Sequence, residues 1–223
     1  MEGMRWMGTA AMALCLEAGV RLAGAQSTRP ADLATGKLLV ASPDLPDPNF
    51  AKTVILLVQY DADGVVGLIL NRRSKVPISR ALDGLAGAKD RPDPVYAGGP
   101  VERTDVLALV RARLASGDAK RVLGDVFLVS TKEGLEKTFA SATDADSVHV
   151  YLGYSGWTAP QLRNELDLGA WYIFPGSAKA VFDSEPDELW PQLIRETEMR
   201  IASRGTTKTF GPRAAGEGWL PLD

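Results

Sequence analysis

The chain has 223 residues, enough for one domain with a well-buried core. Hydrophobic residues make up 45% and charged residues 24%, the composition of an ordinary globular protein. The net charge of -3 excludes the overall basic excess with which proteins attract nucleic acid or anionic lipid. We therefore expect the partner to be a small molecule or a protein.

Residues 1–25 differ in composition from the rest of the chain. An arginine precedes an apolar run at residues 6–16, and small residues at 23–25 offer a cleavage site, so we expect a signal peptide and a periplasmic protein. Two charged residues close to the apolar run are unusual for a signal peptide. The alternative is therefore a misassigned start codon and a cytoplasmic protein. No later apolar run reaches the roughly 18 residues that span a bilayer, so we expect no membrane anchor.

Composition predicts a linker at residues 26–36 and a flexible tail at 203–223, on either side of a folded domain at residues 37–202. The strands predicted from β-branched and apolar runs lie at residues 37–42, 53–60, 65–71, 94–97, 105–112, 125–130, 147–153 and 171–175. The helices predicted from apolar spacing lie at residues 78–87, 131–141, 159–169 and within 185–202.

The loops between these elements indicate the fold class. The four residues 61–64 join two apolar runs and predict a hairpin between them. Strand pairs with short loops and a few interspersed helices predict an α+β fold, a single compact domain with a mixed, largely antiparallel sheet and a few packed helices.

The stretch "VHVYLGYSGW" places His149, the only histidine, six residues before Ser155 in what reads as a glycine-rich turn. A nucleophile elbow needs a second glycine two residues after the serine, and Trp157 stands there instead. The stretch therefore does not predict a serine hydrolase. We predict no catalytic residue from these motifs.

Other chemical motifs are incomplete. The "DADG" stretch begins like a calcium loop, but its glycine comes too early and its twelfth position is Arg72, so a turn is the better interpretation. The only cysteine is Cys15, within the expected signal peptide, so we expect no metal site and no cofactor. The "NRRSK" stretch could hold an anion through guanidinium groups, although such a run is more often a solvated loop.

Four stretches in fixed order carry a family resemblance: "GKLLVASPDLPDPNFAKTVILLVQYDADGVVGLILNR", "VYAGGPV", "VYLGYSGWTAPQLRNEL" and "GAWYIFPGSAKAVFD". Together they resemble the YqgE/AlgH family of small bacterial proteins, from about residue 36 to about residue 194. The resemblance implies a compact α+β fold and transfers no catalytic residue. One branch is described as a transcriptional regulator, and the family is generally cytoplasmic, which an exported copy would contradict.

We expect a non-enzymatic binding or regulatory protein with a cleft where polar and glycine residues gather at strand ends. The candidate ligand-binding residues are Asn71, Arg72, Gly98, Gly99, Pro100, Gly153, Tyr154, Trp157, Gln161 and Glu165. Two alternatives stay open: a transcriptional regulator, and an enzyme of unknown reaction that uses Glu165 as acid or base.

Overall fold

The computed structural model describes residues 32–113, 118–141 and 145–206. The expected signal peptide, most of the expected linker and residues 207–223 of the expected tail lie outside the described residues. Leu33, within the stretch expected to be a linker, is buried in the core. The last helix runs to residue 206, into the stretch where the tail was expected to begin.

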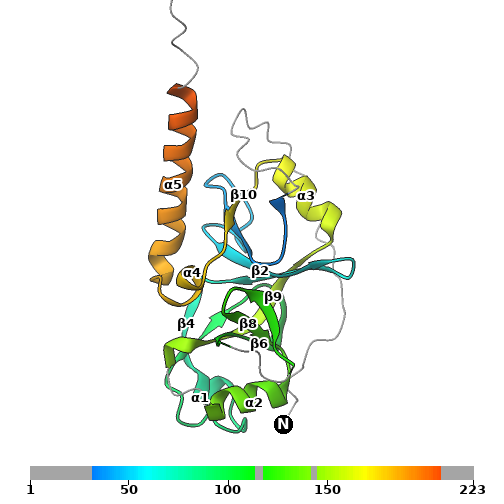
Figure 1. Ribbon diagram of the computed structural model, residues 1–223, viewed down its shortest axis with the longest axis vertical. Helices are drawn as coiled ribbons and strands as arrows, with labels where there is room; N and C mark the ends of the chain where they lie inside the picture. The colour runs from blue at the N-terminus through cyan, green and yellow to red at the C-terminus, as the bar shows by residue number, and fades with distance from the viewer. Residues whose placement is uncertain (1–31, 114–117, 142–144, 207–223) are drawn as a thin grey trace, which may run out of the picture.

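Ten strands form one curled sheet that occupies the centre of the molecule (Figure 1). The strands are β1 (Lys37–Ala41), β2 (Val54–Asp61), β3 (Gly64–Ile69), β4 (Arg73–Pro77), β5 (Pro94–Ala97), β6 (Val101–Arg111), β7 (Lys120–Leu123), β8 (Val126–Val129), β9 (Val148–Trp157) and β10 (Trp171–Pro175). Their order is β10-β1-β2-β3-β9-β6-β8-β7, and β5 joins β4 to β9.

The pairings confirm the predicted fold class. All pairs are antiparallel except β5 and β9, which run parallel, so the sheet is mixed and largely antiparallel within a single α+β domain. The predicted hairpin is confirmed, because β2 and β3 pair from Ile55↔Ile69 to Asp61↔Gly64.

Helices cover the sheet on its outer faces (Figure 1). They are α1 (Ile78–Ala81), α2 (Lys132–Ser141), α3 (Ala159–Asp167), α4 (Ala178–Phe182) and α5 (Pro186–Thr206). Thr158 caps α3 by accepting a hydrogen bond from the Gln161 N–H, with Pro160 in the first turn as predicted. The α5 helix lies along one side of the sheet, where Trp190 donates to the Ala41 carbonyl at 2.8 Å.

Both faces of β1 and β2 are buried, which explains why these strands read as continuous apolar runs. Leu38 and Leu56 enter a cluster beneath α4 and α5, whereas Leu39 and Ile55 enter a second cluster beneath α3. A third cluster joins α1 and α2 to β6 and β9. Full burial of each leucine stabilises the fold by about 1.5–3 kcal/mol.

Four segments differ from the sequence expectation. The helix expected to reach residue 87 ends at Ala81, because Gly84 and Gly87 adopt φ values of 89° and 81° that a helix cannot contain. Residues 73–75, the last three of the "NRRSK" stretch, belong to β4 instead of a loop, since β4 pairs with β5. The β7 strand and the α4 helix were not predicted.

The supposed glycine-rich turn is also strand. β9 continues to Trp157 because its first half pairs with β6 and its second half with β3. Gly153, at φ 70°, lies between the two halves and provides the left-handed conformation at this point.

Candidate functional site

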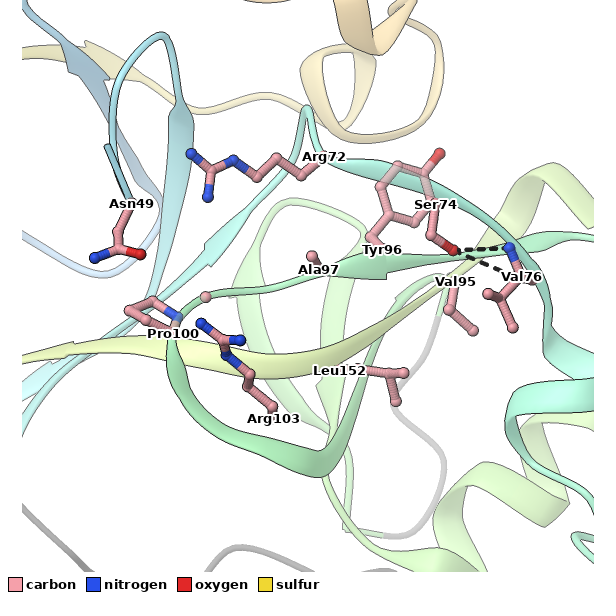
Figure 2. Close-up of a pocket in the computed structure, with 11 residues that line it drawn as sticks. Asn49, Arg72, Ser74, Val76, Val95, Tyr96, Ala97, Pro100, Arg103 and Leu152 are labelled. Atoms are coloured by element: carbon pink, nitrogen blue, oxygen red, sulfur yellow. Dashed lines mark hydrogen bonds between the residues drawn. The ribbon is translucent and has the colours of Figure 1, made fainter. Parts of the chain in front are cut away.

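A pocket of about 400 Å³ opens beside the β4–β5 pair (Figure 2). Its size falls within the range of sites for small molecules. The residues that line it come from four stretches of the chain: Asn49; Arg72, Ser74 and Val76; Val95, Tyr96, Ala97, Gly99, Pro100 and Arg103; and Leu152.

Strand pairing brings these distant segments together. β5 lies between β4 and β9, with Tyr96 opposite both Arg73 and Tyr151. The Ala97 N–H donates to the Arg72 carbonyl at 2.9 Å, so the residue that carries the guanidinium is tied to the edge of β5. A rigid scaffold of strands thus positions the pocket.

Arg72 places a cation at the pocket. Burial lowers the pKa of Arg72 from its ordinary value, and the nearby Asp47 carboxylate acts in the opposite direction. The guanidinium stays protonated because arginine titrates far above neutral pH. One of its N–H groups donates to the Pro48 carbonyl at 3.3 Å, which leaves further donors for a ligand.

Arg103 supplies a second cation, from the irregular part of β6 between Val101 and Val106. Within the described residues, Arg103 forms no ion pair or side-chain hydrogen bond. Its neighbour Glu102 has a φ of 39°, a left-handed conformation that side chains other than glycine adopt at a cost. The turn of the backbone at this point directs Arg103 to the pocket.

The rest of the lining is mostly apolar. Figure 2 shows the polar ends of Arg72, Asn49 and Arg103 on one side of the view and Val95 and Leu152 on the other. The arrangement provides hydrogen-bond donors beside an apolar surface. It offers no nucleophile paired with a base among the described lining residues.

Three of the ten candidate residues line this pocket: Arg72, Gly99 and Pro100. The sequence reasoning missed Asn49, Ser74 and Arg103. Asn49 lies in the proline-rich loop and Ser74 in the "NRRSK" stretch, both of which were noticed for other reasons. Nothing in the local sequence of Arg103 marks it, because only the bend of β6 brings it to the pocket.

Asn71 lies next to the pocket but faces the β1–β2 loop. Its Oδ1 accepts from the Val54 N–H at 2.9 Å, and its Nδ2 donates to the Lys52 carbonyl at 2.8 Å. Lys52 itself has a left-handed φ of 57°. The Asn71 amide therefore holds this loop in place.

We expect Asn71→Ala to lower the free energy of unfolding by about 2 kcal/mol, because two hydrogen bonds to the backbone are lost. Urea unfolding at constant pH measures the change. Asn71→Asp keeps the acceptor for the Val54 N–H, and we expect its free energy of unfolding to fall by roughly half as much. Equal stability of the alanine variant and the wild type would contradict this role.

Gly98 and Gly99 pass against the backbone of β9. A Cβ atom on Gly98 would overlap the Gly153 carbonyl oxygen, and one on Gly99 would overlap the backbone of Tyr154 and Ser155. Gly153 is itself enclosed by the backbone of Val101 and Gly99. These glycines are required for close packing of β5, β6 and β9.

Trp157, Gln161 and Glu165 form a separate cluster under α3. Glu165 Oε2 accepts from the indole N–H of Trp157 at 3.1 Å and of Trp171 at 2.8 Å. Glu165 Oε1 accepts from Gln161 Nε2 at 3.1 Å. Phe50 packs against both indole rings, at 5.7 and 5.6 Å between centroids. This geometry gives Glu165 the role of a structural acceptor.

The buried rings on β9 belong to the core. Tyr154 is 7% exposed, and Tyr151 is fully buried. His149 stacks on Tyr96 at 4.8 Å and packs against Phe182 at 5.0 Å. Ser155 is buried, and its hydroxyl donates to the Gly98 carbonyl at 3.4 Å. The serine and the histidine thus each have other partners, which agrees with the rejection of a hydrolase site.

His149 makes the stability depend on pH. Burial lowers the pKa of His149 from 6.5 to about 4, despite opposing effects of Asp146 and Asp93. Between these values the unfolded chain binds the proton and the folded protein does not, so stability falls as the pH falls. From pH 7 to pH 5 we expect a loss of about 2 kcal/mol from this group.

His149→Phe keeps a ring between Tyr96 and Phe182 and removes the titrating group. Urea midpoints of the wild type and this variant at pH 7 and pH 5 check the expectation. The pH dependence of the variant should be smaller by the same amount. An unchanged dependence would show that the pKa of His149 is the same in the folded and the unfolded protein.

Neither a metal-binding cluster nor a membrane-spanning helix occurs among the described residues. Across residues 32–113, 118–141 and 145–206, no three histidine, cysteine or acidic side chains lie close enough together to hold a metal ion. None of the described helices has the length and apolar character needed to cross a bilayer.

The sequence model of one protein family, described as AlgH-like, matches residues 38–202. The chain belongs to the AlgH-like family. The match covers the whole sheet except the first residue of β1, so the family assignment applies to the domain that carries the pocket. It confirms the resemblance seen in the four sequence stretches.

Individual relatives agree with this AlgH-like assignment. A protein of Streptomyces avermitilis named UPF0301 protein is 36% identical over 178 residues, which cover 77% of this chain and 91% of the relative. The UPF0301 protein of Chlorobaculum tepidum is 34% identical over 165 residues, which cover 73% of this chain and 86% of the relative.

Two solved structures resemble the AlgH-like fold. The solution structure of AlgH from Pseudomonas aeruginosa has a TM-score of 0.60 and 27% identity, covering 86% of this chain and 100% of that one. A crystal structure of DIP2367 from Corynebacterium diphtheriae has a TM-score of 0.63 and 22% identity, covering 74% of this chain and 87% of that one. The second likeness concerns the fold alone.

Proposed function

We propose that this AlgH-like protein is a non-enzymatic binding protein that takes a small molecule into the pocket beside β4 and β5. The observation that supports the proposal is the convergence of four separate stretches of the chain on one pocket with two guanidinium groups and an apolar wall. The pocket carries hydrogen-bond donors for orientation and apolar surface for affinity, the usual composition of a ligand site.

A thermal-shift screen of the full chain against metabolites and nucleotides tests this function. A ligand at about 100 times its dissociation constant should add roughly 2.7 kcal/mol of stability. For a domain of this size the melting temperature then rises by roughly 5–11 °C. Arg103→Gln should reduce the rise, whereas Arg195→Gln, an exposed position on α5, should not.

No shift with any compound would contradict small-molecule binding. A shift that persists unchanged in Arg103→Gln would move the site away from this pocket. The control is matched because both variants replace one exposed arginine by the same shorter, neutral side chain.

Binding could serve regulation, including the control of transcription that the family resemblance implies for one branch. The net charge of -3 does not favour direct contact with nucleic acid. A gel shift with duplex DNA at low and high salt tests direct contact. Salt-sensitive retardation would support the regulator hypothesis over the binding proposal in its simplest form.

A further inference from the structure

We infer that the ligand of the pocket is an amphipathic organic monoanion, with one carboxylate group on an aliphatic or aromatic body. This inference rests on the proposed binding function and adds the chemical class. It depends on the balance of charge at the pocket, on the division of its lining and on the backbone that holds the polar residues.

The charge at the pocket favours a single negative charge. Arg72 and Arg103 contribute two guanidinium groups, and Asp47 lies close enough to Arg72 to affect its pKa. The two lining guanidinium groups and the Asp47 carboxylate together carry one net positive charge, which a ligand can neutralise. A monoanion matches this balance, whereas a phosphate monoester would bring an excess negative charge.

The guanidinium groups are suited to a carboxylate in their geometry as well. Each presents N–H donors in a planar fork that fits two oxygen atoms. One terminal nitrogen of the Arg72 fork donates to the Pro48 carbonyl at 3.3 Å, which limits the rotation of the fork. Arg103 has no competing carboxylate partner among the described residues, so it is available to the ligand.

The lining requires an apolar body on the same molecule. Val76, Val95 and Leu152 line the pocket together with Pro100 and Ala97. Val76 is 41% exposed, unusual for a large aliphatic side chain in this fold, and contact with a ligand would remove that surface from water. A bare inorganic anion would leave this apolar wall hydrated.

Backbone strain lies beside the polar residues of the pocket. Lys52 and Glu102 are the two described non-glycine residues with left-handed φ values, 57° and 39°. Glu102 directly precedes Arg103, and Lys52 closes the loop that carries Asn49. Residues held in costly conformations gather at ligand sites, where the strain places donor groups before the ligand arrives.

The loop that carries Asn49 is fixed independently of any ligand. The Asn49 N–H donates to Asp47 Oδ1 at 2.8 Å, so the same carboxylate that partly offsets the lowering of the Arg72 pKa by burial also shapes this loop. The Asn49 side-chain amide lines the pocket and can donate to a carboxylate oxygen. The polar end of the pocket is thus preorganised for an acceptor.

Calorimetric titration of the full chain with four probes tests the class. The probes are 4-phenylbutyrate, its neutral amide, 3-phenylpropyl phosphate and acetate. We expect 4-phenylbutyrate to bind at least about tenfold more tightly than each of the other three, because only it combines one negative charge with an apolar body. Arg103→Gln should weaken its binding by about tenfold, and Arg195→Gln should leave it unchanged.

The outcomes distinguish a wrong ligand class from a wrong proposed function. If the amide binds as tightly as the carboxylate, the anionic class is wrong while the binding function stands. Tighter binding of 3-phenylpropyl phosphate would show that the pocket prefers a dianion to a monoanion, which would contradict the inferred class. If none of the probes binds and the metabolite screen also gives no shift, the proposed function itself fails. Melting curves of both variants show whether a lost affinity comes from unfolding.

Discussion

Gly98→Ala should lower the free energy of unfolding by about 3 kcal/mol, because the new Cβ would overlap backbone atoms that cannot move independently. The atom in the way is the Gly153 carbonyl oxygen in the middle of β9. Gly98 is held on both sides, since its N–H donates to the Leu152 carbonyl at 2.9 Å and its carbonyl accepts from the Ile69 N–H at 3.0 Å. Relief of the overlap must therefore stretch one of these bonds.

Urea unfolding followed by tryptophan fluorescence measures this loss, and the melting temperature should fall by roughly 6–12 °C. Gly124→Ala is the matched control. Gly124 has a φ of 45° with no atom within 4 Å of the added Cβ, so only the backbone conformation costs energy, about 1 kcal/mol. Equal losses in the two variants would show that β9 can yield at Gly153.

Glu165→Ala should cost about 3 kcal/mol, because the indole N–H groups of Trp157 and Trp171 lose their shared acceptor. These indoles are almost completely buried, at 6% and 2% exposed. Water can therefore reach them only if α3 moves away from the sheet. Loss of Glu165 also releases Gln161, which donates to the other carboxylate oxygen.

The Glu165→Gln variant distinguishes a role of this residue as hydrogen-bond acceptor from a role as acid or base. Both indoles donate to the same oxygen, Oε2, and the amide oxygen of glutamine can replace it. We expect a loss below about 1 kcal/mol for this variant in urea unfolding. A glutamine variant as unstable as the alanine variant would show that the negative charge itself is required.

Much of the fold could be predicted from local chemistry. The β2–β3 hairpin follows from two apolar runs with a four-residue loop, and α3 follows from Thr158, Pro160 and the glycine at its end. The helix at α1 was predicted too long because apolar spacing continues through Leu82 and Leu85, which are indeed buried. The apolar spacing there correctly indicates which residues are buried. The glycines with left-handed φ values determine that the helix does not continue.

The candidate site was predictable only where its residues stand in marked stretches. Arg72 follows a strand end in a basic run, and Gly99 with Pro100 forms a visible break between strands. Glu165 and Asn71 were noticed as polar residues near strand ends, yet their side chains make hydrogen bonds within the fold. Polarity in the sequence does not distinguish a residue that supports the fold from one that faces a ligand.

The sequence by itself indicated the family, through four stretches that resemble it. Periodicity and loop length along the chain predicted the α+β class and most strands. The tertiary structure alone decided which polar residues meet. Arg103 lines the same pocket as Arg72 and Asn49 because β6 is irregular at Glu102 and β5 runs parallel to β9. Both features arise from contacts between segments far apart in the sequence, which no local pattern records.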